Sequence, residues 1–304
     1  MKSLPLYLLL GIAWLAGTAQ ALTIAQSPLF IAATEPRVML TLSRDHQLSI
    51  KAYTDYSDLN GDGVLDITYN DAIDYYGYFD TKKCYGYSSG VFSASGSATG
   101  THSHHCSGAW SGNFMNWASM TRMDVLRKVL YGGLRYKDTT GASGETILER
   151  HFLPRDVHAF VKTYNPGSSA TLSLYMPASV VGANTSISLC NASEILTGTY
   201  SNLTGTAAFW PETFASSTTH PAPKIKVAGG LYPQWASAEV KQCEVGGAGT
   251  NPSALLGESA GYTVRVKVCA TSPVEDGCKD YIDTSGVVTT KPTGLVAQTL
   301  TRTV

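Results

Sequence analysis

The sequence predicts a mixed α/β protein, and three observations support this prediction. The segment Asn113 to Tyr131 carries apolar residues at helical spacing. The run Arg37 to Leu42 has the composition of a buried strand. From Thr171 to Val304, short apolar runs alternate with Gly, Pro, Ser and Asn turns, which is typical of β structure. The alternative to an α/β fold is an irregular α+β fold with mostly antiparallel strands.

The first 21 residues have the features of a secretion signal. Lys2 supplies a positive charge, Leu4 to Leu15 is apolar, and Ala19-Gln20-Ala21 matches a cleavage site. The apolar run is shorter than the roughly 20 residues of a membrane span. We therefore expect residues 1–21 to be removed, residues 22–304 to form one domain without a membrane span, and the product to be exported to the cell surface or the periplasm.

Composition narrows the function further. The net charge is -1, only 15% of the residues are charged, and no basic patch stands out. We therefore expect no nucleic acid partner. Six cysteines in an exported chain favour disulfides, but they allow fifteen pairings. Proximity along the chain suggests the pairs Cys84–Cys106 and Cys269–Cys278, which leaves Cys190–Cys243.

Two further strands are expected before residue 75. One runs from Leu48 to Tyr56. The other, Ile67 to Asn70, leads out of the acidic loop Asp58 to Asp66, which lies between the two strands. The tyrosines from Tyr69 to Tyr87 are expected to fill the space between strands and a helix, although an exposed face for sugars or host surfaces is the alternative. Residues 88–108 are rich in Ser, Gly, Thr and His and are predicted to form a long loop.

The predicted helix from Asn113 to Tyr131 has start and stop signals. Ser111 or Asn113 can cap its beginning, and Gly132-Gly133 can end it. Its apolar residues cover more than one face, so we expect it to be buried in the core. Asp124 and Lys128 are spaced for an i,i+4 pair. A second helix is predicted from Pro154 to Tyr164.

The clearest chemical motif is the loop "DLNGDGVLD", from Asp58 to Asp66. Calcium takes six to eight oxygen ligands, and this spacing offers them from a short turn. The predicted ligands are the side chains of four residues and one backbone carbonyl: Asp58, Asn60, Asp62, Asp66 and the carbonyl of Val64. A solvated turn without metal is the alternative, but three carboxylates this close would repel one another.

Two other motifs are weaker. Thr101 to Cys106 contains three histidines, but it lies in the Ser-rich segment and its cysteine has an expected disulfide partner, so we predict no transition-metal site there. Gly86 to Gly90 fits the G-x-S-x-G nucleophile pattern, which requires a following helix, whereas a loop is predicted. We therefore expect no enzyme. A secreted, calcium-stabilised hydrolase is the rival interpretation.

Several stretches together resemble the N-terminal region of the PilY/PilC family of type IV pilus tip proteins. They are "SRDHQL", "KAYTDYSDLNGDGVLDITY", "IDYYGYFDTKKCY", "WSGNFMNWASMTRMDVLRKVLYGG", "TILERHFLPRDVHAFVK", "VRVKVC" and "KPTGL", in this order along the chain. The resemblance implies a role in pilus biogenesis and adhesion, with minor pilins and a host or abiotic surface as partners.

The resemblance also carries an expectation about the fold. The N-terminal region of some relatives looks like a von Willebrand factor A domain, so a degenerate form of it with long β-rich insertions is implied here. The family's C-terminal calcium-binding propeller has no counterpart in these residues. A nonfunctional remnant of a longer tip adhesin is a further alternative. The metal-adhesion motif of that domain is missing, because Ser43 to Gln47 stands where it would be.

Overall fold

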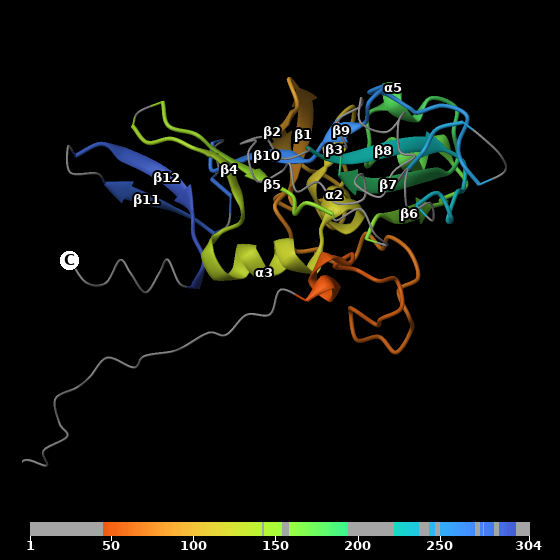
Figure 1. Cartoon of the computed structure of the whole chain (residues 1–304), viewed down its shortest axis with the longest axis horizontal. Coiled ribbons are helices and arrows are strands. Elements are labelled where there is room, and N and C mark those ends of the chain that lie inside the picture. The colour runs from red at the N-terminus through yellow and green to blue at the C-terminus, as the bar shows by residue number, and fades with distance from the viewer. Residues whose placement is uncertain are drawn as a thin grey trace, which may run out of the picture. The chain divides into compact units, whose positions relative to one another are not determined.

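The computed structural model describes residues 45–141, 143–153, 158–193, 222–236, 243–246, 250–270, 274–275, 277–282 and 286–295. The described residues of the compact unit 44–304 form three sheets and five helical segments (Figure 1). The secretion signal and the predicted strand Arg37 to Leu42 lie outside the described residues. No helix in the described part of the chain is long and apolar enough to cross a membrane.

The largest sheet has six strands in the order β3-β1-β2-β10-β5-β4. Its members are β1 (Lys83–Ser88), β2 (Val91–Ser97), β3 (Trp110–Ser111), β4 (Arg135–Asp138), β5 (Thr146–Glu149) and β10 (Arg265–Val268). All of its pairings are antiparallel except that of β10 with β2.

The second sheet has four antiparallel strands in the order β6-β7-β8-β9. They are β6 (Phe160–Tyr164), β7 (Ile187–Ser193), β8 (Pro223–Gly229) and β9 (Tyr262–Thr263). A separate two-stranded sheet pairs β11 (Cys278–Ile282) with β12 (Val288–Pro292). The helical segments are η1 (His46–Ser49), α2 (Gly112–Ser119), α3 (Arg122–Tyr131), α4 (Ser169–Leu172) and α5 (Ala178–Val181).

This architecture is mixed α/β with mostly antiparallel sheets. A doubly wound fold of the von Willebrand type requires a mainly parallel sheet with helices on both faces, and the described residues contain a single parallel pairing. The sheets of the described chain therefore match the irregular, mostly antiparallel alternative.

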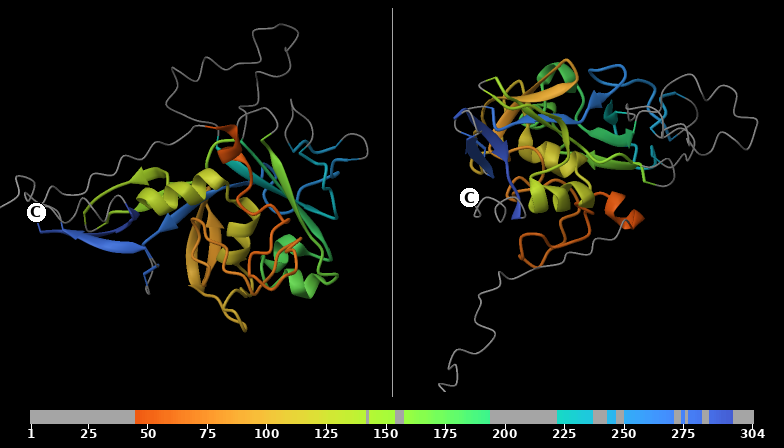
Figure 2. Two further views of the ribbon diagram at one scale, coloured as in Figure 1. Left: turned by 90° about the horizontal axis from the view of Figure 1, so that it is seen from below. Right: turned by 60° about the vertical axis from the view of Figure 1, so that its left-hand side comes forward.

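Helix α2 is the centre of the core. All eight of its residues are buried, and it lies between the two larger sheets (Figure 2). Ser111 caps it by accepting from the backbone N–H of Phe114, as expected. On its other side, Asn191 of β7 donates to the carbonyl of Ala118 at 2.8 Å. Trp117 is 1% exposed, so the predicted burial of this segment is correct for α2.

The predicted single helix is in fact two helices. The chain leaves the helical conformation at Met120, and Thr121 caps α3 through a reciprocal pair of bonds with Asp124. Asp124 is the one fully buried residue of α3, which shows that this helix lies nearer the surface than α2. The predicted Asp124–Lys128 pair is absent: Lys128 donates instead to the carbonyl of Gly77. Gly132 ends α3 with a φ of 85°.

Other elements differ from the prediction. Leu48 to Tyr56 is not a strand: η1 occupies its start, and Lys51 makes an isolated bridge to Thr121. The described end of the predicted helix Pro154 to Tyr164 is strand β6, because Phe160 and Lys162 alternate with half-exposed neighbours and pair with β7. The predicted long loop contains β2, which follows β1 through a hairpin turn.

The tyrosine-rich segment fills the core, as predicted. Tyr69, Tyr75, Tyr78 and Tyr85 are each at most 5% exposed, whereas Tyr76 is 44% exposed. The ring of Tyr69 lies 4.9 to 5.6 Å from five other aromatic rings: Tyr75, Phe114, Trp117, Tyr164 and Tyr175. All three disulfides join the predicted cysteines.

Candidate functional site

The acidic loop folds around the carboxylate of Asp58. This carboxylate accepts hydrogen bonds from the backbone N–H groups of Gly61, Asp62 and Gly63, at 2.7, 3.1 and 2.8 Å. The two glycines have φ values of 77° and 84°, which residues with a side chain rarely adopt. The loop is closed at its base by an antiparallel bridge between Ser57 and Asp66. The sequence therefore folds into a compact turn that wraps around the carboxylate of Asp58.

Hydrogen bonds tie together four of the five predicted calcium ligands, Asp58, Asn60, Asp62 and Val64, whereas Asp66 bonds other residues. The amide of Asn60 donates to Asp62 at 2.9 Å, and Asp62 accepts from the backbone N–H of Val64 at 2.8 Å. Asp66 accepts from the backbone N–H of Leu59 at 2.9 Å and from the amide of Asn70 at 3.1 Å. Asp66 thus links the loop to the chain that enters the core.

The oxygen-rich donor set fits a hard cation such as calcium, but the loop is wider than a closed metal cage. Within the described ranges, one group of three His, Cys, Asp or Glu side chains brings its ligand atoms within 4.8 Å of one another: Cys269, Glu275 and Cys278. These two cysteines form a disulfide, so they offer no thiolate. Calcium binding by the acidic loop would draw Asp66 toward Asp58 and Asp62.

The stem before the loop is anchored by a buried ion pair. The ammonium of Lys162 is fully buried and lies 2.7 Å from both carboxylate oxygens of Asp55. It also lies 4.6 Å from the centroid of the Trp117 ring, whose N–H donates to Asp55 at 3.0 Å. Burial lowers the pKa of Lys162 to about 7, against the opposing attraction of Asp55. Asp55 itself adopts a φ of 62°, so the chain turns sharply here.

The stem after the loop is anchored by two buried asparagines of α2. Asn113 accepts from the backbone N–H of Tyr75 at 2.8 Å and donates to the carbonyl of Ile73 at 2.9 Å. Asn116 accepts from the backbone N–H of Phe79 at 3.0 Å. These side chains take the place of a strand partner for a segment without regular structure. The sequence carries a signal of this role that was not used in the prediction, namely two asparagines on an otherwise apolar helix.

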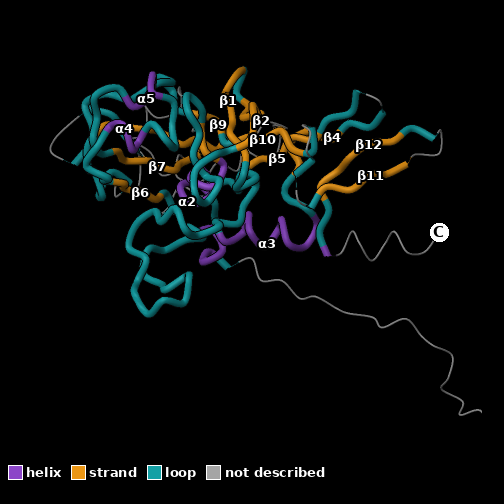
Figure 3. The backbone as a smooth tube through the Cα atoms, turned by 180° about the vertical axis from the view of Figure 1, so that it is seen from behind, coloured by secondary structure: helices purple, strands orange, loops and turns teal. Residues whose placement is uncertain are grey.

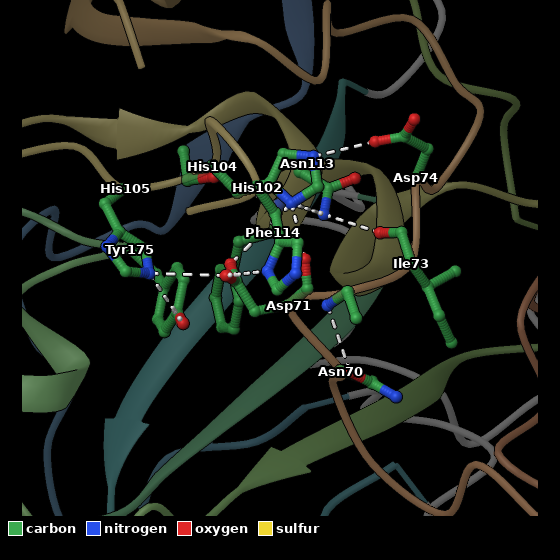
Figure 4. Close-up of polar contacts among 12 residues, drawn as sticks. Asn70, Asp71, Ile73, Asp74, His102, His104, His105, Asn113, Phe114 and Tyr175 are labelled. Carbon is green, nitrogen blue, oxygen red and sulfur yellow. Dashed lines mark hydrogen bonds and ion pairs between the residues drawn. The ribbon is translucent and has the colours of Figure 1, made fainter. Parts of the chain in front are cut away.

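The histidines also converge on this segment (Figure 4). The carboxylate of Asp71 lies 3.0 Å from Nδ1 of His102 and 3.3 Å from Nε2 of His105. His104 is 1% exposed, and its ring nitrogens lie 2.7 Å from the carbonyl of Asp71 and 2.8 Å from the carboxylate of Asp74. The sequence predicts a loop for these histidines, and the structure holds them against Asp71 and Asp74.

Two arrangements could suggest catalysis, and neither has the required geometry. Ser88 ends β1, and the turn Ser89-Gly90 leads into β2, so the G-x-S-x-G motif is a hairpin and not a strand-to-helix elbow. Ser49 lies 3.0 Å from Nε2 of His151, but Nδ1 of that ring faces the guanidinium of Arg127 at 3.4 Å. A cation at Nδ1 keeps the proton on Nε2, so the ring cannot take a proton from the serine.

A cavity of about 240 Å³ lies between the tyrosine-rich segment, α3 and β11. Three acidic residues line it, and two of them are held in ion pairs: Asp74 with His104, and Glu275 with Lys83 at 3.5 Å. The third, Asp80, accepts from the backbone N–H of Lys82. This cavity therefore gives no specific support to a hydrolase.

The acidic loop also carries exposed apolar side chains, and it projects away from the sheets (Figures 1 and 3). Five large apolar residues within twelve positions are between 43% and 77% exposed: Tyr56, Leu59, Val64, Leu65 and Ile67. Exposed apolar groups gathered in this way are typical of a surface that binds a partner.

Comparison with known proteins agrees with the resemblance found in the sequence. A family model described as "PilY1 homolog, small alpha/beta domain" matches residues 66–209, just under half of the chain. Two curated relatives from Xylella fastidiosa (strain Temecula1 / ATCC 700964) are each named "Type IV pilus biogenesis factor PilY1 homolog". One is 45% identical over 148 residues, which are 48% of this chain and 10% of the relative. The other is 34% identical over 117 residues, which are 36% of this chain and 9% of the relative.

The chain therefore matches about a tenth of the length of these relatives. No solved structure matches it.

Proposed function

We propose that this chain, whose residues 66–209 match the family model of a PilY1-homolog domain, is an exported type IV pilus tip-like protein that acts in pilus biogenesis and adhesion. The family match is the observation that supports this function best. Three disulfides within the described chain agree with an oxidising, extracytoplasmic location. In this proposal, residues 22–304 form one non-catalytic domain.

We propose further that the acidic loop binds one structural calcium ion. The ligands are the side chains of Asp58, Asn60, Asp62 and Asp66 with the carbonyl of Val64. The two left-handed glycines and the bridge at the loop's base support this assignment, because they hold the carboxylates within one turn. Calcium would offset the repulsion of three carboxylates that have no lysine or arginine among residues 56–67.

The role of the ion in this proposal is to fix a binding surface. With the carboxylates drawn inward, the exposed apolar residues of the loop are held in one arrangement. Its partners are minor pilins, or a host or abiotic surface. The anchors on both sides of the loop, Lys162–Asp55 and Asn113–Tyr75, give the ordered loop a rigid base.

The calcium assignment is tested by thermal unfolding with calcium and with chelator. A ligand that binds the folded state alone stabilises it by RT ln(1 + [L]/Kd), about 2.7 kcal/mol at a hundredfold excess over Kd. The expected result is a higher midpoint with calcium for the parent protein and no such rise for Asp62→Ala. Asp280→Ala is the matched control, because Asp280 is exposed on β11 and bonds Thr290. Equal midpoints for the parent with and without calcium would refute the site.

The pilus function is tested in the bacterium that encodes the chain. Deleting the gene is expected to reduce the number of surface pili and the attachment of cells, and the parent gene should restore both. Asp62→Ala is expected to restore pili incompletely if calcium orders the assembly surface. Unchanged piliation and attachment after deletion would overturn the proposed function while leaving the calcium measurement intact.

A further inference from the structure

The buried pair at the stem of the acidic loop, Asp55 and Lys162, has the geometry of two groups that can react with each other. The Nζ atom of Lys162 lies 2.7 Å from both carboxylate oxygens of Asp55. With C–O bonds of about 1.2 Å, a nitrogen equally close to both oxygens lies within about 3.1 Å of the carboxyl carbon between them. Reacting atoms in a near-attack arrangement are about 3–3.5 Å apart. The nitrogen is therefore already placed against the carbon with which an amide bond would form.

The amine of this pair is shut off from water. The side chain of Lys162 is 0% exposed, and that of Asp55 is 17% exposed. The ring of Trp117, itself buried, lies 4.6 Å from Nζ of Lys162. Burial lowers the pKa of Lys162 to about 7, so the neutral amine, which is the nucleophilic form, is present near neutral pH. A site that excludes water also protects an amide bond from hydrolysis once it has formed.

Two more groups lie where the reaction needs them, one at each carboxylate oxygen. The indole N–H of Trp117 donates to Oδ1 of Asp55 at 3.0 Å, and a donor there stabilises the negative charge that develops on this oxygen. The ammonium of Lys51 lies 3.7 Å from Oδ2, so it can pass a proton to the oxygen that leaves. The backbone carbonyl of Tyr53 accepts from Nζ of Lys162 and orients the amine.

The charge of the pair also favours the reaction. Two ions that are taken out of water lose their hydration, and their mutual attraction often fails to offset this loss. An amide carries no net charge, so its formation removes both buried charges at once. The exposed pair of Lys137 with Glu145 lacks this driving force, because the side chain of Lys137 is 48% exposed and stays hydrated.

We propose that Lys162 and Asp55 form an intramolecular isopeptide bond after the chain has folded. Nζ of Lys162 attacks Cγ of Asp55, the new C–N bond forms, and the bond from Cγ to Oδ2 breaks. The Lys162 ammonium gives up two protons in all, Lys51 relays them to Oδ2, and that oxygen leaves as one water molecule. No oxidant, reductant or cofactor is consumed. The bond would join residues 107 positions apart and fix the stem of the acidic loop to β6, without calcium or a pilus partner.

The test is the intact mass of the purified full chain after reduction and denaturation. The parent is expected to be lighter than its calculated mass by one water molecule, and its proteolytic digest should contain two peptides joined through Asp55 and Lys162. Lys162→Arg keeps the positive charge but should have its full calculated mass. Asp55→Asn should lose ammonia instead of water, because its leaving group is an amide nitrogen. Lys137→Arg is the matched control, since Lys137 forms an exposed ion pair with Glu145, and this variant should still lose water.

Two outcomes would overturn the proposal. A parent with its full calculated mass would make the pair an ion pair only. Loss of water that persists in Lys162→Arg would place the dehydration elsewhere, for example in a cyclised Asp62 at its bond to Gly63. If the Lys162→Arg variant does not fold, the presence or absence of the joined peptides in the parent decides the question. Lys51→Gln removes the proton donor and is expected to give a mixture of linked and unlinked chains.

Discussion

Asn116 of α2 holds the tyrosine-rich segment in place, and replacing it by alanine tests this directly. Its side chain accepts from the backbone N–H of Phe79 at 3.0 Å. It also donates to the carbonyls of Tyr75 and Phe79, at 2.7 and 2.8 Å. The residue is fully buried, and no water replaces these bonds without opening the core. Gly77 allows the approach, because a methyl group there would lie 2.2 Å from the Asn116 oxygen.

The magnitude follows from the three backbone groups that lose a partner. Each buried polar group without a hydrogen bond costs about 1–3 kcal/mol. The better helix propensity of alanine returns less than about 1 kcal/mol. Three such groups cost about 3–9 kcal/mol, so after the propensity gain the Asn116→Ala variant should lose at least about 2 kcal/mol. A domain typically has only about 5–15 kcal/mol of stability in total, so this loss is large.

Urea unfolding of the parent and the Asn116→Ala variant measures the effect as a lower midpoint with a similar slope. Asn165→Ala is the control: Asn165 is exposed and makes one bond to the backbone N–H of Gly167, so the change should stay below about 0.5 kcal/mol. A loss under 1 kcal/mol for Asn116→Ala would show that the segment is held by packing of its rings and not by this side chain.

Two further predictions follow from buried contacts. Burial lowers the pKa of His151 to about 4, and the nearby cations Arg127 and Arg150 add to this effect. As the pH falls below 6.5, the unfolded chain therefore binds a proton at His151 before the folded chain does. Between pH 6.5 and 4, the free energy of unfolding of the parent should therefore fall by up to about 3 kcal/mol, and the His151→Gln variant should not show this fall. Urea unfolding at each pH measures the effect. The control variant His46→Gln should behave like the parent. A methyl group at Gly112 would lie 2.0 Å from the carbonyl oxygen of Asp80, so Gly112→Ala should destabilise by about 1–3 kcal/mol or more. Gly86 has open space around it, so Gly86→Ala should not destabilise the protein. Equal urea midpoints for the two alanine variants would refute the close approach of Gly112 to Asp80.

Part of the fold could be read from local signals. Residue types and their spacing predicted the cap at Ser111, the helix end at Gly132, the burial of Trp117 and the three disulfide pairs. These features depend on neighbours close in sequence or on a small number of cysteines. The mixed α/β class was predictable for the same reason, because its helix and strand patterns are local.

The missed features depend on contacts between distant segments. The break between α2 and α3 was hidden because apolar residues continue across it, although Thr121 and Asp124 have capping-box spacing. Strand β2 was hidden by its Ser and Gly content, and it is stabilised by pairing with β1 and β10. Ser89 and Gly90, both with positive φ, were the local sign of the hairpin.

The candidate sites were predictable to different degrees for the same reason. The acidic loop is contiguous in sequence, so its ligands could be named without a structure. The cluster around Asp71 joins residues more than thirty positions apart, and tertiary contacts such as those of His104 with Asp74 and Asn113 bring the two segments together. Amino-acid composition does not distinguish a flexible loop from a loop that tertiary contacts hold in place.

The pilus assignment and the calcium assignment depend on different residues. The family match begins at Asp66, where the chain leaves the acidic loop and enters the core, and it contains the asparagines of α2 and the histidine cluster. Four of the five proposed calcium ligands precede it. A failure of calcium binding would therefore leave the family assignment intact. Asp66 bonds Asn70, and the next residue is Asp71, which contacts the histidines. Ordering of the loop would therefore act first on this segment. Calcium is accordingly expected to stabilise this segment from the side of the loop, and it is not required for the fold of the sheets beyond it.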